Sequence, residues 1–425
     1  MAAAAAATAR AAAQKVIRDA PSRAPGSVRR LFALDEAPPL DHLASICSQR
    51  ATREQYPLAA AVESNVPVYT LPAALSALPA ARRGALQDEW YRVLHSGPGV
   101  FVTKGLFRDR ALLERANKAF YSIIERERAE GVSQGDHFAA AGRNDRIWNS
   151  FSKHALADPA SFAEYYGNPF LGLISSAWLG GGYRVTAQVN NVRPGSKAQV
   201  CHRDYHLGFQ TAEGAAQVPR AMHVASQFLT LQGAVAHVDV PPESGPTRLL
   251  PFSQTFDQGY MAYRRQEFVD YFEEHYVALP MECGDGIFFN PALFHAAGEN
   301  ISADVNRMAN LLQISSPFGK PMESVDALPL LDACWDEVVA RHAREGRSDE
   351  VDALLCAICE GYAFPTNLDN NPPRPGGLAP VSELDVAVRG LEEGWGQGEA
   401  PARVQGPSGQ ITTMMHCYER RQICA

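Results

Sequence analysis

The sequence has no apolar run near the ~18 residues that a membrane-spanning helix needs. Its eight cysteines are scattered over 425 residues without a dense framework, and no secretory apolar segment precedes them. These absences predict reduced thiols in an intracellular, cytoplasmic protein. An excess of basic residues is also missing, and the net charge of −8 argues against a nucleic-acid-binding surface. We therefore expect the partner to be a small molecule, while the sequence leaves the oligomeric state open.

Two local patterns have a functional and a structural interpretation. Residues 1–39 form an Ala/Arg-rich leader with a single acid before residue 35, which is the bias of an organellar transit peptide. A disordered or frayed alanine-rich helix is the interpretation we favour. Cys356 and Cys359 form a C-x-x-C pattern, but apolar residues at helical spacing surround them and no second Cys or His pair is near. Buried structural cysteines are therefore expected there.

The composition and hydrophobic pattern of the sequence divide the chain into four parts. After the leader, residues 40–95 resemble a helical extension with irregular connections. Apolar residues at i, i+3 and i+4 spacing predict an amphipathic helix over residues 109–130, packed on one face of a flat element. Short apolar segments broken by Gly and Pro then run from about Gly181 to residue 320, which favours a β-sandwich or jelly roll over βαβ units. We assign residues 96–320 to this mainly β domain, and residues 321–425 to a helical and irregular C-terminal extension.

The stretch QVCHRDYHLGF contains the strongest chemical signal. If it ends a strand, alternation projects His202 and Asp204 to one face and Arg203 to the other, with Cys201 also pointing away. A third ligand must then come from elsewhere. His295 is the best candidate, because GIFFNPALFHAAGEN is predicted as one buried strand that ends in this histidine.

Two imidazoles and one carboxylate on one side of an ion form the facial triad that suits non-haem Fe(II) and leaves open positions for a cosubstrate and O2. Twelve residues after His295, Arg307 begins a predicted strand. Its planar guanidinium can bind a carboxylate through two hydrogen bonds. This is what the distal carboxylate of 2-oxoglutarate requires.

With these residues in place, the sequence resembles the phytanoyl-CoA dioxygenase-like group of Fe(II)/2-oxoglutarate oxygenases. The resemblance covers roughly residues 95–320 and is carried by the segments GVFVTKGLF, VRPGSKAQVCHRDYHLGF, PPESGPTRLLPFSQ, GDGIFFNPALFHAAGENIS and NRMANLLQIS. It implies a double-stranded β-helix core (jelly roll, cupin-like), iron ligands at His202, Asp204 and His295, and a 2-oxoglutarate partner at Arg307. It also implies cosubstrate contacts from the strand that holds Gln188 and Asn190. The sequence departs from the family at Gln254, where a histidine usually follows the serine.

The resemblance implies a dioxygenase that hydroxylates an unactivated C–H bond of a small organic substrate, with succinate and CO2 as co-products. Alternatives remain open. The same site could desaturate, cyclise or peroxidise, and a jelly-roll binding or sensor protein could carry a non-catalytic metal site. A zinc hydrolase lacks an H-E-x-x-H motif.

Neighbouring residues receive secondary roles. Alternation would put His206 on the face of His202, and we expect it to line the pocket or support Asp204 rather than bind the metal. Tyr205 and Phe209 are expected in the core. Arg143 and Arg146 could reach a carboxylate, but a solvated or ion-paired surface position is favoured.

Overall fold

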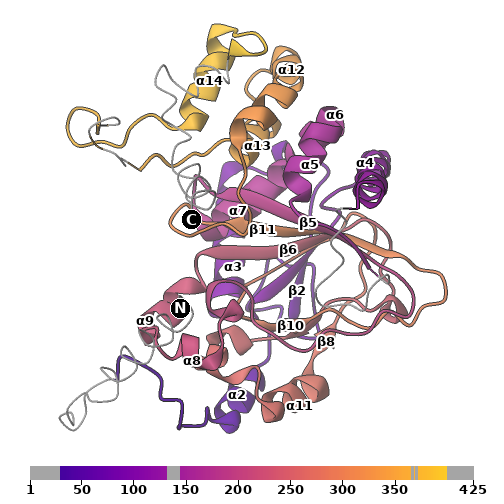
Figure 1. The fold of residues 1–425 in the computed structure, drawn as a ribbon, viewed down its shortest axis with the longest axis vertical. Coiled ribbons are helices and arrows are strands. Elements are labelled where there is room, and N and C mark those ends of the chain that lie inside the picture. The colour runs from indigo at the N-terminus through magenta and orange to yellow at the C-terminus, as the bar shows by residue number, and fades with distance from the viewer. Residues whose placement is uncertain (1–28, 132–143, 365–367, 369–371, 400–425) are drawn as a thin grey trace, which may run out of the picture.

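The computed structural model describes residues 29–131, 144–364, 368 and 372–399. Within these residues two β-sheets enclose a shared interior (Figure 1). The larger sheet has the strand order β1-β2-β3-β9-β6-β11-β5-β4, and the smaller has the order β10-β7-β8. The strands of the larger sheet are β1 (Ala61–Glu63), β2 (Val66–Thr70), β3 (Val100–Lys104), β4 (Asn144–Ile147), β5 (Arg184–Val192), β6 (Thr230–Ala236), β9 (Gly286–Phe289) and β11 (Arg307–Ser315). Those of the smaller sheet are β7 (Arg248–Leu250), β8 (Val277–Ala278) and β10 (Phe294–Ala296).

From β5 onward the chain passes back and forth between the two sheets. β5, β6, β9 and β11 lie in the larger sheet, while β7, β8 and β10 lie in the smaller one, which an isolated bridge between His202 and His295 extends. This alternation is the double-stranded β-helix, or jelly roll, that the sequence predicted.

Helices cover the outer face of the larger sheet, in the upper part of Figure 1. The α-helices of the described residues are α2 (Leu40–Cys47), α3 (Ala80–His95), α4 (Arg110–Ala129), α5 (Ser150–Ala157), α6 (Pro159–Tyr166), α7 (Pro169–Leu179), α8 (Ala212–Ala215), α9 (Arg220–Ser226), α10 (Gly259–Ala262), α11 (Gln266–His275), α12 (Ala327–Glu345), α13 (Asp349–Ile358) and α14 (Glu383–Glu393). The predicted amphipathic helix is confirmed as α4. It begins after Asp109, whose carboxylate accepts a hydrogen bond from the backbone N–H of Ala111, and it buries an apolar face that includes Phe120 and Ile123.

Strand alternation separates the two faces of the larger sheet. On β5, Val185, Ala187 and Val189 pack into the core beneath the helices, whereas Gln188 and Asn190 point into the interior between the sheets. β11 follows the same rule and pairs with both β5 and β6. Because side chains alternate along each strand, Gln188 and Asn190 on β5 and Arg307 and Gln313 on β11 are directed at one cavity.

Several details differ from the sequence-based predictions. Residues 40–95 contain α2 and α3 but also the β1-β2 hairpin, whose second strand pairs in parallel with β3, so the predicted boundary at residue 95 cuts through the larger sheet. GIFFNPALFHA is two strands, β9 and β10, because Asn290 and Pro291 turn the chain from one sheet to the other. The C-terminal extension, predicted to be helical and irregular, contains α12, α13 and α14.

The C-terminal helices hold the two closely spaced cysteines. Cys356 lies in α13 and Cys359 follows its end, and both are free thiols. Burial raises the pKa of each thiol, and the described residues place no further metal-binding groups beside them. These findings agree with the prediction that Cys356 and Cys359 are buried structural cysteines. Residues 1–28 of the leader lie outside the described residues, and none of the helices that the structure describes is long and apolar enough to cross a membrane.

Candidate metal centre and cavity

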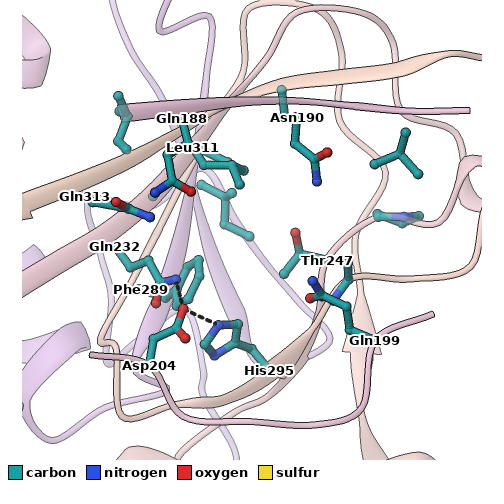
Figure 2. Close-up of a pocket in the computed structure, with 18 of the residues that line it drawn as sticks. Gln188, Asn190, Gln199, Asp204, Gln232, Thr247, Phe289, His295, Leu311 and Gln313 are labelled. Carbon is teal, nitrogen blue, oxygen red and sulfur yellow. Dashed lines mark hydrogen bonds and ion pairs between the residues drawn. The ribbon is translucent and has the colours of Figure 1, made fainter. Parts of the chain in front are cut away.

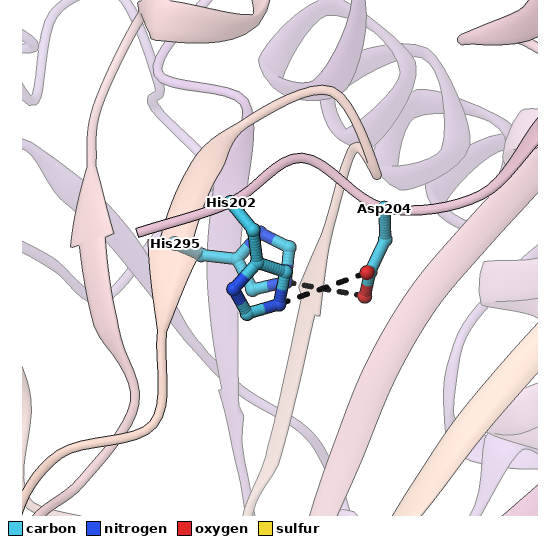
Figure 3. Close-up of side chains that lie close together, drawn as sticks. All are labelled: His202, Asp204 and His295. Atoms are coloured by element: carbon cyan, nitrogen blue, oxygen red, sulfur yellow. Dashed lines mark ion pairs between the residues drawn. The ribbon is translucent and has the colours of Figure 1, made fainter. Parts of the chain in front are cut away.

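Backbone pairing brings the three predicted ligands together. His202 and His295 exchange backbone hydrogen bonds, with N–O distances of 2.9 and 3.1 Å, and the N–H of Asp204 donates to the carbonyl of Pro291 at 2.9 Å. One potential ligand atom from each of the three side chains lies within 4.8 Å of the others (Figure 3). This is the one group of three or more His, Cys, Asp or Glu side chains in the described residues that could hold a metal ion.

The two imidazoles are oriented by backbone carbonyls. The Nδ1 atom of His202 lies 2.9 Å from the carbonyl oxygen of Val200, and that of His295 lies 2.8 Å from the carbonyl oxygen of Leu293. Since a carbonyl only accepts, each Nδ1 carries a proton, and Nε2 is the ring atom directed at the other ligands. The Nε2 atoms lie 3.6 Å (His202) and 3.3 Å (His295) from the nearest oxygen of Asp204. Burial, together with the neighbouring His295, lowers the pKa of His202, which favours the neutral form that binds metal.

The carboxylate of Asp204 is held in its ionised form. Its Oδ2 accepts a hydrogen bond from the side-chain amide of Gln232, on β6 (Figure 2). Burial alone would raise the pKa of Asp204, but His202, His295 and Gln232 outweigh it, and the pKa lies well below its usual range. The donor set therefore fits a divalent cation with three adjacent N and O ligands.

A cavity of about 280 Å³ opens beside these residues and is lined by both sheets. Gln188, Gln232 and Gln313 gather on one side of it, and Gln199 and Thr247 lie on the other (Figure 2). Many of the remaining lining residues are apolar, among them Val192, Ala234, Ala236, Val240, Met281, Ile287, Phe289, Ala309 and Leu311. Such a pocket, mostly apolar with a few placed polar groups, is typical of a small-molecule site.

Arg307 lines this cavity from the first position of β11. Its side chain is 8% exposed, and burial lowers its pKa to about 10. Within the described residues no acid neutralises this guanidinium. A buried cation facing a cavity is suited to bind an anionic group of a ligand. Gln188 and Asn190 also line the cavity, from β5.

The segment after Asp204 departs from the predicted strand. Tyr205 and His206 have φ values of 58° and 42°, and a 3-10 helix over His206–Phe209 follows. This left-handed pair ends the alternation, so His206 is neither in the metal-binding group nor among the residues that line the cavity. The prediction that His206 lines the pocket was wrong. Phe209 is 58% exposed and lines the cavity, so its core placement was wrong as well, whereas Tyr205 is buried.

Three further predictions concern residues near the site. Cys201 is buried in a separate apolar cluster with Phe256 and Phe294, away from the three ligands, as expected. Arg146 was predicted at a solvated or ion-paired position on the surface, but it lines the cavity, donates from Nε to the side-chain oxygen of Gln188 at 3.1 Å and lies over the Trp148 ring. The surface placement was wrong, because the pairing of β4 with β5 carries Arg146 over the cavity. Arg143 lies outside the described residues.

The sequence analysis missed the two glutamines on the central strands. Gln232 and Gln313 are opposite each other on β6 and β11, and both line the cavity. Their only signal in the sequence is a glutamine in each of the strands TLQGAVA and RMANLLQIS, at a position where an inward-facing residue would normally be apolar.

The chain is similar in sequence to known proteins. The family model described as Phytanoyl-CoA dioxygenase (PhyH) matches residues 77–309, more than half of the chain. The dioxygenase trt7 of Aspergillus terreus is 27% identical over 165 residues, which are 39% of this chain and 47% of that protein. The chain thus spans about half the length of this curated relative.

Solved structures show weaker likenesses. The non-haem α-ketoglutarate-dependent epimerase SnoN from nogalamycin biosynthesis is 19% identical, with a TM-score of 0.38 over 55% of this chain and 84% of that one. The carbocyclase SnoK from the same biosynthesis is 18% identical, with a TM-score of 0.40 over 58% and 87% of the two chains. Likenesses at this level carry no information on the reaction.

Proposed function

Because the chain belongs to the phytanoyl-CoA dioxygenase family of non-haem iron and 2-oxoglutarate-dependent oxygenases, we propose that it hydroxylates an unactivated C–H bond of a small organic molecule. One oxygen atom of O2 enters the substrate and the other enters succinate, as 2-oxoglutarate loses CO2. The bound iron, with 2-oxoglutarate and O2, supplies the oxidising power for this reaction. The protein has to hold the iron, orient the cosubstrate and position the substrate.

The observation that carries the proposal is the orientation of the three ligands. Both histidines have Nδ1 tied to a backbone carbonyl and Nε2 directed at Asp204, so no side-chain rotation is needed before a cation binds. His202, Asp204 and His295 would hold Fe(II) on one side. The carboxylate of Asp204 would offset part of the charge of the ion, and Gln232 would keep that carboxylate in place.

Arg307 is the proposed partner of the distal carboxylate of 2-oxoglutarate. Its burial removes competing water, and its fork geometry matches a carboxylate. Asn190, on β5, lines the cavity in the neighbouring register position and would contact the same cosubstrate, because Asn190 pairs with Ala309, two residues after Arg307. Gln188 lies further along β5, where Arg146 and Glu323 hold its amide, so it would shape the wall between cosubstrate and substrate.

The volume of the cavity supports a small substrate. Ligand pockets usually measure roughly 300–1,000 Å³, and this cavity of about 280 Å³ must hold 2-oxoglutarate as well as the reacting part of the substrate.

The test begins with anaerobic titration of Fe(II) and 2-oxoglutarate, which should produce a visible charge-transfer band in the wild type and none in Asp204→Ala. A screen of small organic molecules then follows succinate release, and mass spectrometry of the products should show the addition of one oxygen atom. Loss of two hydrogens or ring closure would replace hydroxylation by desaturation or cyclisation. Absence of the band would overturn the proposed iron and 2-oxoglutarate site.

A further inference from the structure

The turn that follows the metal ligand Asp204 places an aromatic side chain beside the cavity. Phe209 ends the 3-10 helix His206–Phe209, lines the cavity and is 58% exposed. Among the large apolar side chains that are exposed in the described residues, that of Phe209 is the one that also lines the cavity. Single exposed apolar side chains are common on protein surfaces, so only its place at this cavity calls for a specific explanation.

The backbone on both sides of Phe209 is fixed by the protein. The carbonyl oxygen of Gly208 accepts hydrogen bonds from the hydroxyl of Tyr263 at 2.7 Å and from Nη2 of Arg264 at 3.0 Å. The same guanidinium donates from Nη1 to the carbonyl oxygen of Gln210 at 2.8 Å. These hydrogen bonds keep the turn in place, so the ring is not carried into the core.

The start of the turn is restricted as well. Tyr205 has φ 58° and ψ 163°, a backbone conformation that residues other than glycine rarely adopt. Gly208 packs so closely on Arg203 that a Cβ atom would lie 2.2 Å from the carbonyl oxygen of Arg203. The turn buries Leu207 in an apolar cluster and leaves Phe209 at the cavity. Strained backbone that is held in this way indicates that the position of the ring serves the site.

Two further large apolar side chains line the same cavity. Trp148 follows β4, and Met322 lies in the segment after β11, and both are half-buried. The two segments are joined by a hydrogen bond of 2.7 Å from the backbone N–H of Asn149 to the carboxylate of Glu323. Three segments that are distant in the sequence therefore bring large apolar side chains to one cavity.

The cosubstrate does not account for the exposed ring. 2-Oxoglutarate carries a carboxylate at each end, and the proposed function assigns one end to the iron and the other to Arg307. Metal ions and hydrogen-bond donors bind such groups, whereas a phenyl ring does not. Only the two methylene groups between these ends are apolar. A charged group of the substrate would also be unsuitable at Phe209, because it would lose hydration against an apolar surface.

We propose that Phe209 is a specificity-determining residue that packs against an uncharged, apolar ring of the substrate, while the reacting C–H bond enters the cavity. The proposal rests on the proposed function, because it names the substrate class of the same site. The cavity of about 280 Å³ holds the cosubstrate and the reacting part of the substrate, and the remaining ring covers Phe209. The contact is favourable because it removes apolar surface from water on both sides.

Two alcohols test the ring contact. 2-Naphthalenemethanol and benzyl alcohol share a CH2OH group, but only the naphthyl compound has a second ring that can cover Phe209. Dissociation constants are measured by ligand-observed NMR on the full chain loaded with 2-oxoglutarate and Zn(II), which has no redox chemistry. The wild type should bind the naphthyl compound about tenfold more tightly, because its second ring is removed from water.

Variants of Phe209 assign that preference. Phe209→Ala should reduce it to about threefold or less, and Phe209→Leu should restore part of it, because leucine keeps some of the apolar surface. Phe318→Ala is the matched control, since Phe318 is 71% exposed and does not line the cavity, and it should keep the full preference. A preference that survives unchanged in Phe209→Ala overturns the proposal.

Fluorine NMR locates the naphthyl compound directly. The protein is labelled with 4-fluorophenylalanine at its 19 phenylalanines, and the signals of Phe209 and Phe318 are identified by their loss in the two alanine variants. Addition of 2-naphthalenemethanol should shift the signal of Phe209 and leave that of Phe318 in place. An unshifted Phe209 signal in the presence of bound naphthyl compound would show that the ring binds elsewhere, and this result also overturns the proposal.

The remaining outcomes separate the ring contact from the proposed function. Equal binding of the two alcohols by the wild type, or binding of neither, overturns the ring contact even when the charge-transfer band with Fe(II) and 2-oxoglutarate is present. A higher Kd for 2-oxoglutarate in Phe209→Ala would assign the ring to the cosubstrate and overturns the ring contact too. Absence of the charge-transfer band in the wild type overturns the proposed function itself.

Discussion

Replacement of Arg307 by lysine provides the most direct test of the cosubstrate site. Lysine keeps the positive charge but cannot reproduce the two parallel N–H donors of the guanidinium. Loss of one charge-assisted hydrogen bond costs about 1.5–3 kcal/mol. At 1.4 kcal/mol per factor of ten, the Kd of 2-oxoglutarate should rise by about 10- to 150-fold in Arg307→Lys. The Kd of the metal should stay unchanged, since Arg307 is not in the ligand group.

Burial adds a pH dependence to this variant. The same surroundings that lower the pKa of Arg307 to about 10 would lower that of a lysine, which starts from a lower ordinary value. A cation is needed to bind the carboxylate, so binding is lost as pH rises through the pKa of the free protein. The variant should therefore lose affinity for 2-oxoglutarate at a lower pH than the wild type.

Anaerobic titration followed by the charge-transfer band gives the Kd of 2-oxoglutarate, and calorimetry with Mn(II) alone gives the Kd of the metal. Arg347→Lys, at an exposed ion pair with Asp352 before α13, is the matched control and should change neither. An unchanged Kd for 2-oxoglutarate in Arg307→Lys would refute the assignment. Arg146, the other described arginine that lines the cavity, would then be the next candidate for the carboxylate site.

The remaining predictions concern the metal centre and the stability of the fold. His202→Ala and His295→Ala should each abolish Fe(II) binding in calorimetry, whereas His206→Ala should retain it; metal binding by His295→Ala would mean that the triad is wrong. Gln232→Leu removes the donor to Asp204 and should weaken Mn(II) binding about 10- to 100-fold, so an unchanged affinity would contradict its supporting role. Burial lowers the pKa of His237 from 6.5 to about 3, so the unfolded chain takes up a proton that the folded protein refuses, and the free energy of unfolding falls as pH drops below about 6.5. Urea unfolding of the metal-free protein at several pH values below about 6.5 gives the change in the free energy of unfolding per pH unit. This change should be smaller by about 1.4 kcal/mol per pH unit in His237→Gln than in the wild type, and equal changes would show that His237 is protonated in the fold.

The local hydrophobic pattern was sufficient to predict elements in which that pattern has a single clear period. α4 was predicted because its apolar residues recur at helical spacing, and β5 and β11 because they are apolar segments bounded by turns. The grouping of His202, Asp204 and His295 was predictable for another reason. Few arrangements other than a metal site account for that combination of residue types on inward-facing strand ends.

Features set by long-range pairing were not predictable. Nothing in the sequence around β2 indicates that this strand pairs in parallel with β3. Arg146 faces the cavity because β4 pairs with β5. The residues around Arg146 do not indicate this pairing. Alternation failed after Asp204 because Tyr205 adopts a positive φ, which a non-glycine residue rarely does and which no residue type there signals.

The division of the site between the two sheets has a thermodynamic consequence. His295 belongs to β10 of the smaller sheet and His202 is bridged to it, while Arg307 belongs to β11 of the larger sheet. A 2-oxoglutarate molecule bound at one end to the iron and at the other to Arg307 would act as a further cross-link between the two sheets, in addition to the chain segments and side-chain packing that join them. We expect such a cross-link to slow amide hydrogen exchange in β7 and β10 more than iron alone does. Its contribution to stability would grow with the free cosubstrate concentration as RT ln(1 + [L]/Kd).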